Sequence, residues 1–366
     1  MRQAFVAEWE DLDHHAIEPN VYLSPDFVIP AGEHLAPSPG LLLLRVRVDG
    51  RLAGLGVFQH AGVSWRMPCP HLRAYASPYA PVTGLLLRRG AEREALGGLL
   101  RWMREDLHAP RAIEFEEWRT DGQTASLLGA LLPEFGLDWW SYYKRERAVL
   151  LRAQSGGSAF DALGSKRRKN MRRALRDLEA IGPVRWELRR GTGVTPAAVD
   201  RFLALEALGW KGEEGTAMLS KPADTRFFRN VVDRLAVKNR VFFSELWCGD
   251  QIVASNSNFI AGDMGFAFKV GWDPRFRDQS PGILNELQFM EGFAEAMPDI
   301  ACIDGGAQPG SFIDGLWAGR MALEWGMLVS GALLSRYGQV LSAVREIRDA
   351  VRPPAGRDGA DTAGGA

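Results

Sequence analysis

The chain has 366 residues, of which 46% are hydrophobic, and its formal net charge is −1. This length favours two domains of ordinary size, and the apolar fraction is sufficient for real hydrophobic cores. The balanced charge gives no case for nucleic acid or an anionic membrane as a partner of the whole surface. Any such case must rest on a local cluster of charge.

The three cysteines, Cys69, Cys248 and Cys302, show no paired spacing, so they predict neither a zinc site nor a disulfide framework. The first residues carry charges where a signal peptide needs an apolar segment. No apolar run reaches the length of a membrane span. We therefore expect a cytoplasmic protein without a transmembrane segment and without a metal site.

The first half predicts a strand, a tight turn and a second strand over residues 41–59, because two apolar segments flank an Asp-Gly pair. An apolar, strand-like segment over 79–87 follows Ser77-Pro78. A helix is then predicted over 91–107 and a strand over 112–115. A polar, glycine-containing break at residues 154–158 separates this half from the next.

Residues 165–181 predict an amphipathic helix whose apolar residues share one face, namely Met171, Ala174, Leu175, Leu178 and Ile181. Its other faces carry seven cations, Lys166, Arg167, Arg168, Lys169, Arg172, Arg173 and Arg176. A solvated basic face and a docking strip for a phosphorylated substrate, a cofactor phosphate or an acidic membrane both explain these cations. The absence of interleaved aromatic residues argues against a reader of single-stranded nucleic acid.

The second half repeats the order of the first. A hairpin over residues 241–259 has a Gly-Asp turn, and it is followed by a strand over 264–272. After a loop over 272–280, a helix over 282–297 and a short strand over 300–304 complete the pattern.

This repeated order predicts two copies of one α+β unit, over residues 1–153 and 159–350, with a disordered tail over 353–366. The alternative is that two unrelated α+β domains share hairpins by chance. The first half lacks the glycine that opens the helix after Ser280-Pro281 in the second. If one copy is catalytic, we therefore expect it to be the second.

The helix that begins at Pro281-Gly282 predicts a seat for a phosphate or pyrophosphate. The first N–H groups of a helix have no partner within it, and the positive end of the helix dipole attracts anions. Lys269 lies in the otherwise apolar strand before this helix. It requires either a phosphate or an acid such as Asp304 as its partner.

Two carboxylates are candidate bases in the second half. Asp304 ends a strand before two glycines, and Glu245 alternates with Phe243 and Trp247 on another strand. An Asp that caps the next turn is the alternative for Asp304. All six histidines lie in the first half, so the second half has no histidine base.

Trp210 and Lys211 lie in a glycine-punctuated segment after a predicted helix. They are candidates for the wall of a substrate site. Trp210 could equally close the hydrophobic core.

Five segments occur in an order that resembles the cellulose-biosynthesis (CelD)/BioF-like branch of the GNAT acyltransferase superfamily. They are EALGWKGEEGTAM (206–218), FFR (227–229), FAFKVGW (266–272), SPGIL (280–284) and FIDGLWAGR (312–320). That branch is similar to the Fem-type peptidyltransferases, which carry two GNAT units in tandem. The resemblance covers about residues 160–335 well and the first half in outline. It implies an α+β fold of two GNAT-like units, each with a mixed, largely antiparallel sheet flanked by helices, the first unit being degenerate.

The resemblance also implies a site for acetyl-CoA or another acyl-CoA. Gln279 and Gly282 match the Q-x-x-G pattern of the superfamily, whereas Leu284 replaces its next small residue. The residues implied to bind the cofactor are Phe268, Lys269, Val270, Gln279, Ser280, Gly282, Ile283 and Leu284. No tyrosine follows Asp304 in the next helix, and Ser311 is the stand-in for the usual proton donor. The residues implied to bind the acceptor are Trp210, Lys211, Trp317 and Arg320.

The expected function is an acyl-CoA-dependent N-acyltransferase in which an amine attacks the thioester directly, with Glu245 or Asp304 as base and backbone donors polarising the carbonyl. The acceptor would be a small molecule or saccharide amine, such as an amino sugar or another precursor of a cell-surface polysaccharide. One alternative is a Fem-like transferase that uses aminoacyl-tRNA, with the basic helix as its RNA contact. Another is an inactive GNAT-fold scaffold in polysaccharide assembly.

Overall fold

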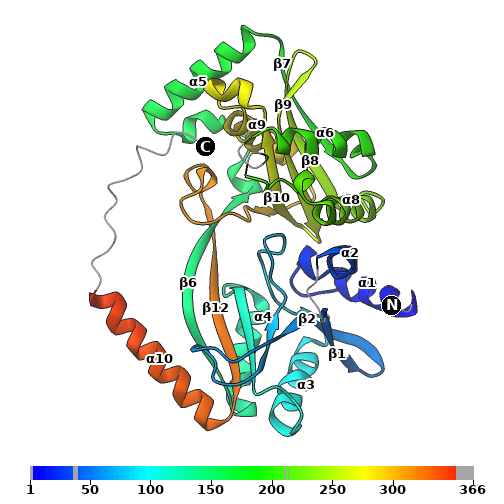
Figure 1. Ribbon diagram of the computed structural model, residues 1–366, viewed down its shortest axis with the longest axis vertical. Coiled ribbons are helices and arrows are strands. Elements are labelled where there is room, and N and C mark those ends of the chain that lie inside the picture. The colour runs from blue at the N-terminus through cyan, green and yellow to red at the C-terminus, as the bar shows by residue number, and fades with distance from the viewer. Residues whose placement is uncertain (1–2, 36–39, 210–211, 213, 352–366) are drawn as a thin grey trace.

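The structure is a computed structural model that describes residues 3–35, 40–209, 212 and 214–351, apart from the side chains of 342–351 (Figure 1). The described strands are β1 (Leu42–Val48), β2 (Arg51–Ala61), β3 (His71–Ala74), β4 (Leu86–Leu87), β5 (Ala112–Arg119), β6 (Leu137–Leu151), β7 (Val184–Arg190), β8 (Val241–Cys248), β9 (Gln251–Ala261), β10 (Met264–Trp272), β11 (Cys302–Asp304) and β12 (Gly319–Ser330). The longer described helices are α1 (Gln3–His14), α2 (Pro25–His34), α3 (Glu92–Glu105), α4 (Gln123–Phe135), α5 (Ser165–Glu179), α6 (Pro196–Ala207), α8 (Pro222–Ala236), α9 (Pro281–Ala296) and α10 (Ala332–Val351).

The two predicted hairpins are confirmed as β1–β2 and β8–β9, both antiparallel. Their turns contain residues with positive φ, Asp49 at 50° and Gly50 at 79° in the first and Gly249 at 58° in the second. Such turns match the right-handed twist of hairpin strands, which explains the Asp-Gly and Gly-Asp pairs in the sequence.

All described strands belong to one sheet in the order β1-β2-β3-β5-β12-β6-β11-β10-β9-β8-β7, with β4 beside β2. The last strand of each half pairs with strands of the other half. Strand β12 enters between β5 and β6 of the first half, and β6 pairs with β11 of the second. In Figure 1 the long strands β6 and β12 run side by side through the middle of the molecule. This exchange joins the halves through backbone hydrogen bonds.

The repeat expected from the sequence is visible in the strand directions. Each half contains one parallel pair, β3 with β5 and β10 with β11, while the other pairs are antiparallel. Helix α3 precedes β5 and helix α9 precedes β11, so each parallel pair is connected through a helix, as parallel strands require. The predicted α+β class, with a mixed and largely antiparallel sheet flanked by helices, is confirmed.

Helix α2 packs on α8 of the second half, and α1 packs beside it on β2 and β4 of the first. The ring of Phe27 on α2 lies 5.2 Å from that of Phe227 on α8, edge to face, and Tyr22 lies 5.5 Å from Phe266 on β10. These side chains share one apolar core with Trp9 of α1. Residues assigned by sequence to the first unit therefore cover a face of the second.

Three local expectations need correction. Ile181 is 59% exposed, because α5 ends at Glu179 and the chain leaves the core there. The strand-like segment over 79–87 forms only the two-residue strand β4, since its apolar side chains enter cores from a loop. The expected loop at 272–280 contains a 3-10 helix over Pro274–Gln279. The tail over 353–366 lies outside the described residues.

Candidate functional site

The candidate site lies where the parallel strands β10 and β11 separate. Their pairing ends at Phe266 with Asp304, because β11 stops there while β10 continues for six residues. After β11 the chain passes close to β10. A Cβ at Gly306, whose φ is 61°, would lie 2.7 Å from the Ala267 carbonyl oxygen. Ligands of α/β sheets commonly bind at the carboxyl ends of parallel strands. We call this place the β10–β11 divergence.

A bulge in β10 at Phe268 redirects the side chains beside the divergence. The register with β9 shifts between Ala267 and Lys269. Phe268 stacks with Phe228 of α8 at 5.8 Å, and the Lys269 ammonium lies 4.8 Å from the ring centre of Tyr79. Consecutive side chains thus point to the same face, which alternation along a regular strand would not allow.

Val270 pairs with Asn256 of β9, whose amide donates to Glu286 of α9. Val270 therefore faces the α9 side of the sheet, opposite to Lys269. The two faces of β10 at this point carry different chemistry, an apolar wall with a buried acid on one and a cation with aromatic rings on the other.

The N-terminus of α9 is built on a strained residue. Ser280 has a φ of 47°, in the left-handed region that residues other than glycine seldom adopt. Its carbonyl accepts from the N–H groups of both Ile283 and Leu284, at 3.0 and 3.1 Å. Pro281 has no N–H, so the Gly282 N–H is the donor of this turn left without a backbone acceptor in the described part of the chain. This helix start therefore offers fewer unpaired N–H donors to a phosphate than a general helix start would.

A small side chain would fit at Gly282. A Cβ there would come no closer than 3.6 Å to Trp272, which is an ordinary contact. Gln279 and Ser280 precede this turn, and Leu284 is buried in the core beneath it. Leu284 therefore packs the helix onto the sheet.

The basic helix α5 packs against the 3-10 segment Pro274–Gln279, so its cations lie beside the approach to Gly282. Met171, Ala174 and Leu178 are buried in the core shared with α9, as the apolar spacing predicted. Asp161 pairs with Arg168 and Arg172 at 3.3 and 3.1 Å. Arg173 pairs with Asp177 at 3.4 Å. The other cations of the helix raise the local positive potential at this end of the sheet.

Asp304 lies at the point of divergence and is 1% exposed. Its carboxylate accepts from Arg147 Nη1 and from the Gly306 N–H, both at 3.0 Å. Arg147, on β6 of the first half, also donates to Glu117 at 2.9 Å. The strand exchange thus supplies the counter-ion for Asp304, a contact that sequence reasoning missed.

Glu245 is fully buried on β8, and β9 separates it from β10. Its Oε2 accepts from Arg189 Nε at 2.7 Å. The structure therefore does not bring Glu245 next to Asp304.

Ser311 follows β11 and precedes the 3-10 turn Phe312–Gly315. Its hydroxyl is buried without a partner among the described residues. Trp317 is 1% exposed in the core beneath α9, and Arg320 donates to the carbonyl of Trp317 within its own segment. Trp210 and Lys211 lie outside the described residues.

A tyrosine from the first half covers the bulge of β10. The Tyr79 hydroxyl donates to Asp224 Oδ2 of α8 at 2.5 Å, and its ring stacks on Phe227. Burial and this bond to a carboxylate raise the pKa of Tyr79, so the phenol stays protonated at neutral pH. Sequence reasoning missed Tyr79 because the catalytic unit was expected in the second half, whereas Tyr79 lies in the loop after Ser77-Pro78 in the first half.

Comparison with protein families gives a match within the second half. Residues 165–308 match the family model described as an acetyltransferase (GNAT) domain. Among curated proteins, none matches this chain. The branch of the superfamily expected from sequence is not among these findings.

Solved structures show the fold of the whole chain. FemX is similar with a TM-score of 0.58 and 12% identity, over 88% of this chain and 95% of that one. A protein of unknown function from Bacteroides thetaiotaomicron VPI-5482 gives a TM-score of 0.55 and 12% identity, over 88% and 97%. The C-terminal DUF2156 domain of a protein from Agrobacterium fabrum gives 0.53 and 12%, over 93% and 96%. At this identity the similarity concerns the fold.

Among the described helices, none is both long enough and apolar enough to cross a bilayer. The same residues contain no group of three or more His, Cys, Asp or Glu side chains placed to hold a metal ion.

Proposed function

We propose that this chain, whose residues 165–308 match a GNAT-type acetyltransferase domain, is an acyl-CoA-dependent N-acyltransferase. The observation that carries the proposal is the β10–β11 divergence with the N-terminus of α9 beyond it. Within the described residues, the pairing of β10 with β11 ends at Phe266 and Asp304, and the two strands separate beyond it. The Gly282 N–H, which has no backbone acceptor among the described residues, suits a pyrophosphate group.

The residues present fit an acyl-CoA. Gln279, Ser280, Gly282 and Ile283 would hold the pyrophosphate at the start of α9, and the cations of α5 would favour its charge. An amide-containing arm would lie along β10 at Phe268, Lys269 and Val270. When bound, the cofactor supplies a thioester carbonyl as the acyl donor.

We assign the acceptor site to the face of β10 that carries Lys269, against which Tyr79 and Asp224 lie. Asp224 is 8% exposed, and Tyr79 orients its carboxylate. An amine held at this face would be positioned next to the divergence, which converts a bimolecular attack into a local one. The acceptor class we propose is an amine on a small molecule or saccharide.

For removal of the ammonium proton, the position of Asp304 at the divergence favours it over Glu245, which β9 separates from β10. The Arg147 ion pair fixes the direction of the Asp304 carboxylate. Ser311 has a hydroxyl that no described acceptor uses, and we assign it as a hydrogen-bond donor to the leaving thiolate.

The test is a thermal-shift measurement of the full chain with acetyl-CoA, succinyl-CoA and palmitoyl-CoA. A ligand at 100 times its Kd stabilises the folded state by about 2.7 kcal/mol, which raises Tm by several degrees. Gly282→Glu places a carboxylate where the phosphates would bind and should abolish the shift. Gly282→Ala is the matched control, because a Cβ meets only an ordinary contact there. No shift with any of the three thioesters would overturn the proposal.

A second candidate, transfer from aminoacyl-tRNA, is favoured by one observation. Arg173 on α5 is 77% exposed and Arg172 is 54% exposed, so the strip is accessible to a large polyanion. The fold similarity to FemX is compatible with either donor.

A further inference from the structure

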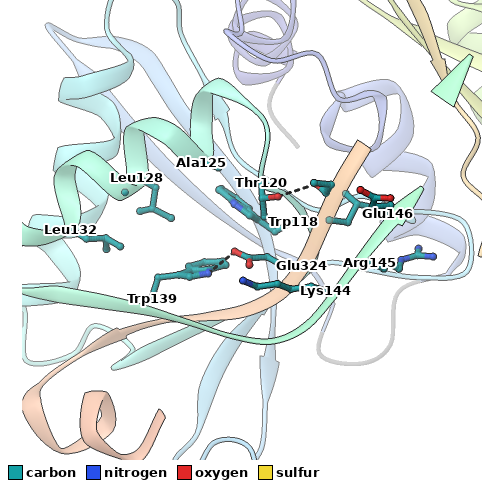
Figure 2. Close-up of a pocket in the computed structure, with 13 residues that line it drawn as sticks. Trp118, Thr120, Ala125, Leu128, Leu132, Trp139, Lys144, Arg145, Glu146 and Glu324 are labelled. Carbon is teal, nitrogen blue, oxygen red and sulfur yellow. Dashed lines mark hydrogen bonds between the residues drawn. The ribbon is translucent and has the colours of Figure 1, made fainter. Parts of the chain in front are cut away.

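The first half contains a pocket of about 560 Å³ between α4 and the strands β6 and β12 (Figure 2). This volume lies in the range of small-molecule sites, about 300–1,000 Å³. Its walls come from both halves, because residues 322–324 of the exchanged strand β12 form part of its floor. The residues of the β10–β11 divergence do not line it.

The body of the pocket is apolar. The indole rings of Trp118 and Trp139 lie 5.6 Å apart, and Leu128 and Leu132 of α4 line the same space. Figure 2 shows the two leucines facing the indoles across the pocket. Gly129 also lines the space and is exposed, and a Cβ added there would meet no atom within 4 Å. The pocket is therefore open at Gly129.

One carboxylate is fixed at the wall. Glu324 is 8% exposed, and its two oxygens accept from Trp139 Nε1 at 2.7 Å and from the Ser141 hydroxyl at 2.5 Å. A carboxylate has about four acceptor positions, so capacity for a further donor remains. The same bond to Trp139 orients the indole that forms the apolar wall.

One ammonium group lies beside it. Lys144 is the cross-strand partner of Glu324, so both side chains leave the same face of the sheet. Within the described residues the two do not come within the 4 Å of an ion pair, and Lys144 is exposed. Arg145 is occupied elsewhere, since its guanidinium donates to Glu117 and to Gln308. Glu146 lies toward Thr120, away from Trp139 (Figure 2).

We propose that this pocket binds a free α-amino acid with an apolar or aromatic side chain. The ligand ammonium would donate to Glu324, its carboxylate would accept from Lys144, and its side chain would lie between the indoles and α4. Charge-assisted bonds of this kind are the strong ones. A simple anion would be repelled by the Glu324 carboxylate, and a simple cation would be repelled by the Lys144 ammonium. A zwitterion can pair with both groups.

The test is isothermal titration of the full chain with L-leucine and L-phenylalanine. Leucinamide lacks the carboxylate and N-acetyl-L-leucine lacks the ammonium, and each should bind at least 10-fold more weakly than L-leucine. Glycine, which has no apolar side chain, should also bind at least 10-fold more weakly than L-leucine. Lys144→Met should weaken the binding of L-leucine by about 10-fold and leave the binding of leucinamide unchanged, because only L-leucine has a carboxylate that bonds to Lys144.

Gly129→Phe should abolish binding by filling the open space, and Gly129→Ala is the matched control that leaves most of it free. Absence of binding by both amino acids, equal binding of the blocked analogues, or unchanged binding by Gly129→Phe would each overturn the proposal. Gly282→Glu, which tests the acyl-CoA site, should leave amino-acid binding unchanged. The two proposals therefore fail independently.

Discussion

Glu286 is an acidic residue of α9 whose side chain points into the protein. It is 4% exposed, and Asn256 donates to one of its oxygens while the other has no partner among the described residues. Burial raises its pKa from 4.5 to about 8, because a carboxylate loses its hydration there. At neutral pH the folded protein therefore holds a proton at Glu286 that the unfolded chain releases.

This difference predicts a pH-dependent stability. The folded-state pKa lies above the unfolded one, so the contribution of Glu286 is complete below pH 4.5 and is lost as pH rises toward 8. Glu286→Gln should become more stable than wild type over this interval, by on the order of a few kcal/mol at pH 8. Urea unfolding between pH 5 and pH 8 measures it. Glu295 on the same helix is exposed, so the stability of Glu295→Gln should depend on pH as that of wild type does. If the stability of Glu286→Gln also changed with pH in parallel with wild type, the expectation would be wrong.

At the scale of elements, α5 combines a buried apolar stripe with an exposed row of cations. The stripe attaches the helix beneath the 3-10 segment Pro274–Gln279, so the cations occupy one fixed position near the start of α9. A helix end and a basic strip acting on one side of the site would strengthen the binding of a phosphate-bearing donor. The size of the donor decides how many of the cations take part.

Salt dependence distinguishes a small donor from tRNA. Each phosphate neutralised contributes about −0.7 to −0.9 to the slope of log K against log salt. If tRNA is the donor, Arg172→Gln with Arg173→Gln should lower the magnitude of this slope by about 1.5 and weaken binding at every salt concentration. Arg93→Gln on α3, exposed and remote in sequence from α5, is the control. Absence of tRNA binding at 20 mM salt would remove the tRNA candidate.

At the scale of the whole molecule, the exchange of β6 and β12 makes each half depend on the other. Arg147 is the clearest expression of this dependence, because its fully buried guanidinium contacts Glu117 of the first half and Asp304 of the second. The halves therefore share hydrogen bonds, an apolar core and a buried ion network. Such coupling favours unfolding as one unit.

Arg147→Met should destabilise the protein by about 3–5 kcal/mol, because it leaves the buried Asp304 carboxylate without its counter-ion. Arg93→Ala breaks the exposed pair with Glu134 and should cost less than about 1 kcal/mol. Urea unfolding followed by tryptophan fluorescence compares the two. A loss below about 1 kcal/mol for Arg147→Met would show that the network does not hold the halves together.

The sequence by itself determined the features that depend on local patterns, namely turns, strands and helix starts. The hairpin turns at Asp49-Gly50 and Gly249-Asp250, strand β10 and helix α9 were predicted within one or two residues, because periodicity and turn chemistry act over short distances. The order of elements also indicated the α+β repeat. Gly282 marked the candidate phosphate seat because a helix start is a local feature.

Only the tertiary structure decided which residues meet. Arg147 reaches Asp304, and Tyr79 covers Lys269, because strands and loops of one half lie in the other. The pocket at Lys144 and Glu324 exists for the same reason, because β12 pairs with β6 although Glu324 and its partner Lys144 are 180 residues apart in the sequence. Strand pairing over such separations depends on the packing of the whole chain, and no short window of sequence carries it.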